Sequence, residues 1–88
     1  MNRHELTNKV EKGKALERLL NNSDFKEIIL EGYLKEYPLD LVLNGSNISN
    51  RHEILDSIGF FKQYLDIVAC DAESALQELL GNEESNHE

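Results

Sequence analysis

The sequence predicts an all-α protein, a three-helix hairpin or bundle whose long C-terminal helix carries a heptad seam. Three observations support this prediction. Apolar residues recur at intervals of three and four, the period of a helix with one buried face, and the alternating pattern of strands is absent. Eighty-eight residues with a single proline form one small domain at most. Short polar clusters at residues 21–24 and 44–47 divide the chain into three periodic segments.

The first segment predicts a helix over about residues 3–20. Asn2 precedes this segment and Glu5 follows three residues later, which is the spacing of a capping box. The apolar residues that fall on one face of this helix are Leu6, Val10, Leu16 and Leu20.

The second segment predicts a helix over residues 24–36 with a short continuation at residues 39–43. Asp24 and Glu27 have the spacing of a second capping box. Apolar residues occupy more than half of the circumference, so we expect this helix to be the central one, covered from two sides. Pro38 cannot continue the hydrogen-bond ladder and predicts a break or kink, after which a helix is favoured over an extended segment.

The third segment predicts a helix over residues 50–80, capped by Asn50 with Glu53 in support. Its apolar residues form an unbroken heptad seam that is roughly 40 Å long. The seam consists of Ile54, Ile58, Phe61, Leu65, Val68, Ala72, Ala75 and Leu79. We expect Gly81 to end the helix, residues 1–81 to form a single domain, and residues 82–88 to be a disordered acidic tail.

This seam is longer than either shorter helix can cover, which predicts self-association as a homodimer or a higher oligomer. The candidate partner interface is Tyr33, Tyr37, Phe60, Tyr64, Leu65, Val68 and Leu76. For the tyrosines, an ordinary core position with the hydroxyl at the surface is an equal alternative. Each helix also contains one interior glycine, Gly13, Gly32 or Gly59. These glycines are expected at close helix crossings, although simple tolerance would also account for them.

The charge of the chain limits the classes of partner. The formal net charge is −8, which argues against binding to a nucleic-acid backbone or to an anionic membrane surface. Residues up to Tyr37 are balanced, whereas no cation follows Lys62. A helix that carries carboxylates without cations can imitate DNA phosphates, although this array is thin and solubility is the simpler explanation.

No catalytic, metal-binding or cofactor-binding constellation stands out in the sequence. The three histidines are far apart, and no phosphate-binding loop or paired-cysteine zinc site occurs. Cys70 lies among acidic residues without a nearby Lys or Arg that would activate it, and is expected to be a buried, inert thiol. We therefore expect a protein without enzymatic activity or cofactor. Since no signal peptide or membrane-spanning run is recognised, we expect it inside a cell.

Parts of the chain resemble a known group of proteins. The segments ALERLLNNSDF (residues 15–25), ILEGYLKEYPLDLV (29–42), IGFFKQYL (58–65) and ESAL (73–76) resemble small helical proteins of tailed bacteriophages that are encoded near virion genes. The likeness extends over nearly the whole chain and consists of packing and turn residues. Asp40 departs from it, because a basic residue is expected there, and the loop before Asn50 is short.

The resemblance implies a phage protein that acts by protein–protein association, first of all a minor virion or head-assembly component. Such a protein would be located in the host cytoplasm, in the virion, or in both. Two alternatives remain open at this point. One is an early phage inhibitor that binds a host or anti-phage defence protein, with acidic DNA mimicry as one route. The other is a small helical ligand-binding domain.

Overall fold

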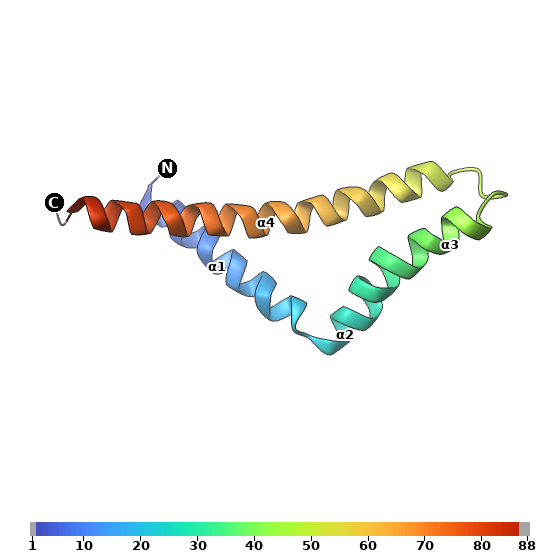
Figure 1. Ribbon diagram of the computed structural model, residues 1–88, viewed down its shortest axis with the longest axis horizontal. Coiled ribbons are helices and arrows are strands. Elements are labelled where there is room, and N and C mark those ends of the chain that lie inside the picture. The colour runs from blue at the N-terminus through green and yellow to red at the C-terminus, as the bar shows by residue number, and fades with distance from the viewer. Residues whose placement is uncertain (1, 87–88) are drawn as a thin grey trace. The chain divides into compact units, whose positions relative to one another are not determined.

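The computed structural model describes residues 2–86, with side chains to residue 81, and every regular element in this part is helical. The elements are α1 (Arg3–Leu20), α2 (Ser23–Phe25), η1 (Lys26–Glu36), α3 (Tyr37–Asn44) and α4 (Arg51–Asn86), as Figure 1 shows. Because α2, η1 and α3 follow one another without a gap, they form one helical run. The predicted all-α fold with a long C-terminal helix is therefore confirmed.

The chain divides into two compact units that share helix α4. The middle unit is the continuous segment Leu19–Tyr64, which holds α2, η1, α3 and the first part of α4. The terminal unit joins α1, up to Arg18, to the part of α4 that begins at Leu65. One amphipathic helix thus supplies an apolar face to two separate cores.

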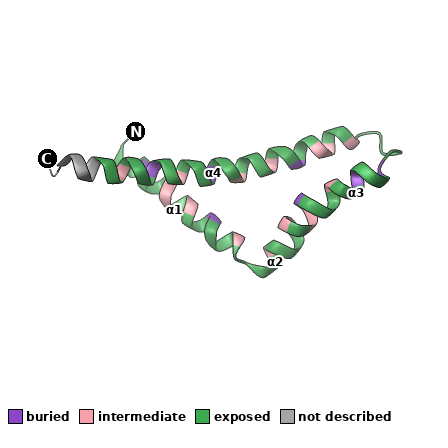
Figure 2. Cartoon of the chain, viewed as in Figure 1, coloured by how far each residue is buried: buried purple, intermediate pink, exposed green. Residues whose placement is uncertain are grey.

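In the terminal unit, α1 packs against α4. Leu6 and Leu16 of α1 are buried, as are Val68 and Ala75 of α4, and Figure 2 marks such positions in purple. The two backbones approach closely at Gly13, where an added Cβ would collide with the Cβ of Ala72. Glycine therefore meets a packing requirement at this position, in spite of its cost of about 1 kcal/mol in a helix.

In the middle unit, η1 and α3 pack against the first part of α4. The buried residues are Leu34, Leu41 and Ile58. The ring of Tyr33 meets that of Phe61 edge to face, with 5.9 Å between the centroids. An Nη atom of Arg51, at the start of α4, donates to the carbonyl oxygen of Leu41 at 3.5 Å, which ties α3 to α4.

The second helical run differs from the prediction in its winding. The run is a π-helix over Lys26–Glu36, and the N–H of Tyr37 donates to the carbonyl oxygen of Gly32, five residues back. Pro38, which has no N–H, stands in the first turn of α3, so the helix continues where the sequence predicts a break or kink. The run is not covered from two sides, since Ile28 is 65% exposed. Helix α4, which serves both units, has the central role.

The ends of the helices show which of the expected caps form. At α1, the side-chain oxygen of Asn2 accepts from the N–H of Glu5 at 2.8 Å, as the capping-box spacing predicts. At α2 the capping side chain is Asn22, which accepts from the N–H of Phe25, and not Asp24. Gly45 ends α3 with a φ of −98°, outside the left-handed region. It is glycine because an added Cβ would lie 2.5 Å from the carbonyl oxygen of Leu41.

Helix α4 carries the predicted seam on its packed side. All eight seam residues from Ile54 to Leu79 are buried or half-buried. The helix runs through Gly81 to Asn86, so the expectation that Gly81 ends it is wrong. No heavy atom lies within 4 Å of an added Cβ at Gly81, and an isolated glycine in a helix is tolerated at a cost of about 1 kcal/mol. The expected disordered tail, residues 82–88, lies outside the residues whose side chains are described.

The close-crossing interpretation of the three glycines applies only to Gly13. An added Cβ at Gly59 meets no heavy atom within 4 Å. At Gly32 the nearest atom is the carbonyl oxygen of Glu27 at 3.2 Å, which belongs to the same π-helix. Gly32 therefore makes room for the local winding of its own helix, and Gly59 is an exposed position without a packing role.

Candidate protein-binding surfaces

The predicted interface residues separate into core and surface positions. Val68 is 8% exposed and Leu65 is half-buried, so both belong to the packed side of α4 and neither is available to a partner. Tyr33 is half-buried, with its ring stacked on that of Tyr37 at 6.2 Å. The remaining predicted residues, Tyr37, Phe60, Tyr64 and Leu76, are exposed.

The heptad seam of α4 is packed within the chain along its whole length. The seam was expected to exceed the cover that the shorter helices provide. Instead, α1 covers its second part within the terminal unit, and η1 and α3 cover its first part within the middle unit. Because each shorter helix covers its own stretch of α4, the length of the seam no longer predicts a dimer.

Exposed apolar surface is concentrated in the middle unit instead. Each large apolar side chain that is exposed by half or more belongs to this unit. These residues are Ile28, Leu39, Val42, Leu43, Phe60 and Tyr64. In the terminal unit, the exposed members of this class are Ile67, Leu76 and Leu80, each less than half exposed. Contiguous apolar surface of this kind marks interaction sites on small proteins.

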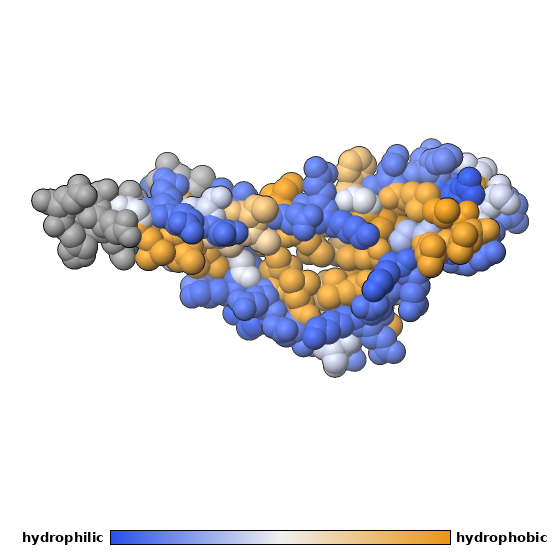
Figure 3. All heavy atoms as spheres, in the orientation of Figure 1, coloured by the Kyte–Doolittle hydropathy of each residue, from blue (hydrophilic) through white to orange (hydrophobic). Residues whose placement is uncertain are grey.

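The largest concentration lies on α3, where Leu39, Val42 and Leu43 form what we call the α3 face. Leu43 is 70% exposed, whereas Leu41 between them is 2% exposed. Leu39 and Leu43 are two residues to either side of Leu41, roughly 160° around the helix, so they point away from the core. Figure 3 shows apolar surface gathered over α3.

The α3 face is absent from the predicted interface, although the sequence contains a signal for it. Four of the five residues at positions 39–43 are apolar, and a helix that packs on one neighbour can bury only one side. One apolar side had to remain exposed. The signal was hidden because the helical state of this short segment after Pro38 was itself in question.

The α3 face has few charges around it. Asp40 is the single charged residue among residues 37–50, in a chain of which 30% is charged. An Oδ atom of Asp40 accepts from the side-chain amide of Asn44 at 2.8 Å, one turn later on the same helix. The nearest charges before this segment, Lys35 and Glu36, have opposite signs, so the surroundings of the α3 face carry few charges and no excess of acids beyond Asp40.

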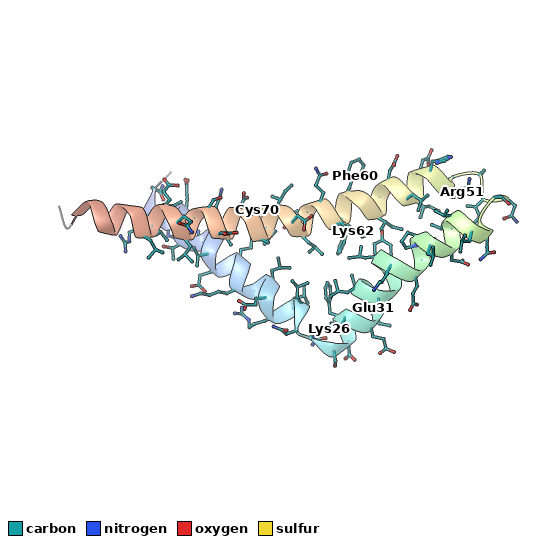
Figure 4. The ribbon with its side chains drawn as sticks, viewed as in Figure 1. Lys26, Glu31, Arg51, Phe60, Lys62 and Cys70 are labelled. Atoms are coloured by element: carbon teal, nitrogen blue, oxygen red, sulfur yellow. The ribbon has the colours of Figure 1, made fainter. Side chains whose placement is uncertain are left out.

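A second exposed surface runs along α4 and combines aromatic with acidic side chains. Glu53, Asp56, Phe60 and Tyr64 follow at spacings of three and four on one side of α4, and we call this set the α4 stripe. All four residues are exposed, Phe60 at 68%. Figure 4 shows Phe60 on the side of α4 that faces away from η1 and α3.

The acidic part of α4 that was considered as a DNA mimic lies against a basic helix. From Leu65 to Gly81, α4 carries four acids and no cation, whereas α1 carries five Lys and Arg against three Glu. The ammonium of Lys9 lies 3.9 Å from a carboxylate oxygen of Asp71. One of these four acids thus lies near a cation of the neighbouring helix, while all four remain exposed.

The described residues show little that indicates chemistry. Among residues 2–81, no group of three or more His, Cys, Asp and Glu side chains is arranged to hold a metal ion. Cys70 is exposed rather than buried, because it lies two residues from Val68 and thus on the outer side of α4. None of the described helices has both the length and the apolar character that a membrane crossing requires.

Comparison with known proteins identifies no family and no relative for this chain. No family model matches the chain, and no curated protein or solved structure shows significant similarity to it.

Proposed function

We propose that the protein has no enzymatic activity and acts by protein–protein association, with the α3 face as its principal contact surface and a second copy of the chain as its first partner. The observation that carries this proposal is the exposure of Leu39, Val42 and Leu43 on one side of an eight-residue helix. A soluble chain gains little from keeping three large aliphatic side chains in water unless another surface covers them.

Charge supports self-association through this face in spite of the net charge of −8. Two chains of the same sign repel each other, and the repulsion is strongest where acids meet acids. Near the contact, the α3 face brings Asp40, to which the side chain of Asn44 already donates a hydrogen bond, and the oppositely charged Lys35 and Glu36 about one turn before Leu39. Pairing two α3 faces therefore adds little like-charge repulsion.

The expected strength of this association is modest. Full burial of one Leu or Val side chain contributes roughly 1.5–3 kcal/mol. Six partly exposed side chains across a symmetric contact offer several kcal/mol, which is comparable to the estimated cost of ~4 kcal/mol or more for lost rotational and translational freedom. We expect a dimer that forms at high protein concentration and dissociates on dilution.

Sedimentation velocity over a concentration series tests this proposal. The wild-type chain should show a rising sedimentation coefficient, whereas the variant Leu39→Ser/Leu43→Ser should remain monomeric. The matched control is Leu76→Ser/Leu80→Ser, which removes two exposed leucines one turn apart from the terminal unit and should leave the dimer intact. A wild-type chain that stays monomeric throughout, or a control that dissociates equally, would refute the proposal.

For the biological role, we propose a minor virion or head-assembly component of a tailed bacteriophage, located in the host cytoplasm, the virion or both. This part rests on the resemblance of residues 15–42 and 58–76, and a tendency to self-associate suits a component of a repeating assembly. Mass spectrometry of purified particles tests it: peptides of this chain should be present in stoichiometric amounts. Their absence, together with capture of a host or defence protein from infected cells, would favour the inhibitor instead.

A further inference from the structure

We propose that the α4 stripe is a second docking surface, and that its occupant is a cationic amphipathic helix of a different protein. The inference extends the proposed function and rests on it in one respect, that the chain acts by association. It concerns another face, another partner and another type of interaction than the α3 face.

The aromatic part of the stripe supplies the anchor. Phe60 lies on α4 two residues beyond Ile58, which is 2% exposed, so the phenyl ring points roughly 160° away from the core of the middle unit. Tyr64 is one turn further along and half exposed. Aromatic side chains that become buried at the centre of a contact contribute most of the binding energy in many interfaces.

The acidic part of the stripe determines which partner fits. Asp56 lies one turn before Phe60 and Glu53 two turns before it, and both are exposed. The cations of the middle unit are Lys26, Lys35, Arg51 and Lys62. Lys26 and Lys35 belong to η1, and helical spacing places Arg51 and Lys62 on the opposite side of α4 from the stripe. A partner helix with Lys or Arg one or two turns from its apolar side chains could place these cations at the carboxylates of the stripe while its apolar side chains contact the aromatic ring.

A second copy of the chain is a poor occupant of this surface. The stripe contains no cation, so a second stripe offers nothing to Glu53 and Asp56. The basic helix α1 of a second copy is not available as an amphipathic helix either, because its apolar side is buried against α4 within its own terminal unit. The two faces therefore select different partners: the nearly uncharged α3 face tolerates an identical chain, whereas the acid-flanked stripe requires a basic one.

The two surfaces are on different sides of the middle unit. Leu41 and Ile58 are both buried where α3 packs on α4, and Arg51 connects these helices through the carbonyl oxygen of Leu41. Since Leu43 and Phe60 each point away from that shared core, one partner does not obstruct the other. One middle unit can then bind a second copy of the chain through the α3 face and a separate basic protein through the α4 stripe.

Fluorescence anisotropy with designed helical peptides tests the inference on the full chain. The probe is a labelled peptide of leucine and lysine, with leucines at spacings of three and four. Its controls are a scrambled peptide of the same composition and a peptide in which glutamate replaces lysine. We expect the first to bind with an affinity that falls with salt, and the two controls to bind at least ~10-fold more weakly.

Variants then locate the contact. Phe60→Ala should weaken binding of the lysine peptide ~10-fold or more, and Glu53→Gln/Asp56→Asn several-fold with a smaller salt dependence. The matched controls are Glu73→Gln/Glu78→Gln, which neutralises two exposed acids in the terminal unit, and Leu43→Ser on the α3 face. Both should bind as the wild type does.

Three results would overturn the inference: no binding of the lysine peptide, equal binding of the scrambled peptide, or an unchanged affinity in Phe60→Ala. Circular dichroism of each variant verifies that its helices are intact. Refutation of this inference is distinguishable from refutation of self-association. The peptide experiment measures binding to the α4 stripe, whereas sedimentation of the Leu39→Ser/Leu43→Ser variant measures association through the α3 face.

Discussion

The terminal and middle units bury two stretches of the same helix, and they do so with different chemistry. In the terminal unit, a basic helix covers an acidic one, the backbones nearly touch at Gly13, and Lys9 lies near Asp71. In the middle unit, a π-helix and the short helix α3 cover α4 through aromatic and aliphatic contacts. The side chains of the terminal unit include a pair of opposite charges between its two helices, whereas the middle unit exposes more large apolar side chains.

This difference in exposed apolar surface separates the two units in their expected response to substitution. The terminal unit has compensating charges between its two helices and exposes few large apolar groups, as expected of a part that only has to hold together. The middle unit leaves Leu43 and Phe60 in water, which favours neither stability nor solubility. Substitutions in the terminal unit should therefore change stability, and those on the outer faces of the middle unit should change binding.

The largest expected effect is on stability in the terminal unit. Val68→Asp places a carboxylate at a position that is 8% exposed, and this should lower the free energy of unfolding by more than ~3 kcal/mol. Ile67→Asp, one residue earlier and 48% exposed, should cost less than ~1 kcal/mol. Urea denaturation followed by circular dichroism measures both, and similar midpoints for the two variants would contradict the packing of α1 on α4.

A second pair of variants tests the two sides of α3. Leu41→Ala empties a position that is 2% exposed and should cost about 2–5 kcal/mol. Leu43→Ala changes a residue that is 70% exposed and should alter stability by less than ~0.5 kcal/mol, while it weakens self-association. Thermal unfolding at low protein concentration separates the two effects. Equal losses of stability would show that the α3 face is part of the core.

Glycine substitutions should have opposite signs in the two units. Gly59→Ala in the middle unit meets no neighbour and should stabilise the protein by about 1 kcal/mol through helix propensity. Gly13→Ala in the terminal unit makes the same gain but collides with Ala72, and overpacking of this kind costs ~1–3 kcal/mol. In chemical denaturation, Ala72→Gly should partly rescue Gly13→Ala. Stabilisation by both single variants would contradict the close helix contact.

The smallest expected effect concerns charge. Lys9→Met removes the cation near Asp71 from a pair that is partly exposed, so the loss of stability should be under ~1 kcal/mol and should diminish as salt is added. Lys35→Met in the middle unit breaks the one-turn pair with Glu31 and should cost only about 0.3–0.5 kcal/mol. Thermal unfolding at low and high salt compares the two variants. A loss for Lys9→Met that is independent of salt would mean that the lysine stem, rather than its charge, stabilises the contact.

The sequence was sufficient to predict the helices and the side of α4 that packs against its neighbours. The intervals from Ile54 to Leu79 identify buried or half-buried positions without exception, because the period of a regular α-helix is a property of the backbone alone. The π-helix at Lys26–Glu36 was missed for the same reason, since its wider turn assigns residues to faces differently from the α-helical period that was assumed.

The candidate surfaces were less predictable than the helices. Periodicity identifies the residues that one helix can bury, but it does not say which of two apolar sides the neighbouring helix covers. Val68 and Phe60 were therefore assigned to one interface, although Val68 is buried in the terminal unit and Phe60 is exposed on the middle unit. Prediction of the α3 face required the conformation of a short segment after a proline. In that segment, burial of Leu41 in the core determines which of the other leucines remain exposed.

Helix α4 also imposes an order on folding, because its two stretches must find partners at different distances along the chain. The middle unit is continuous, and its aromatic contact joins Tyr33 to Phe61. The terminal unit joins Gly13 to Ala72, about twice as far apart in sequence, and the whole middle unit lies in the intervening loop. Closing the longer loop first would cost about 0.6 kcal/mol more entropy, whereas prior folding of the middle unit shortens the open chain. The unit proposed to bind partners therefore forms first, and the α1 contact closes last.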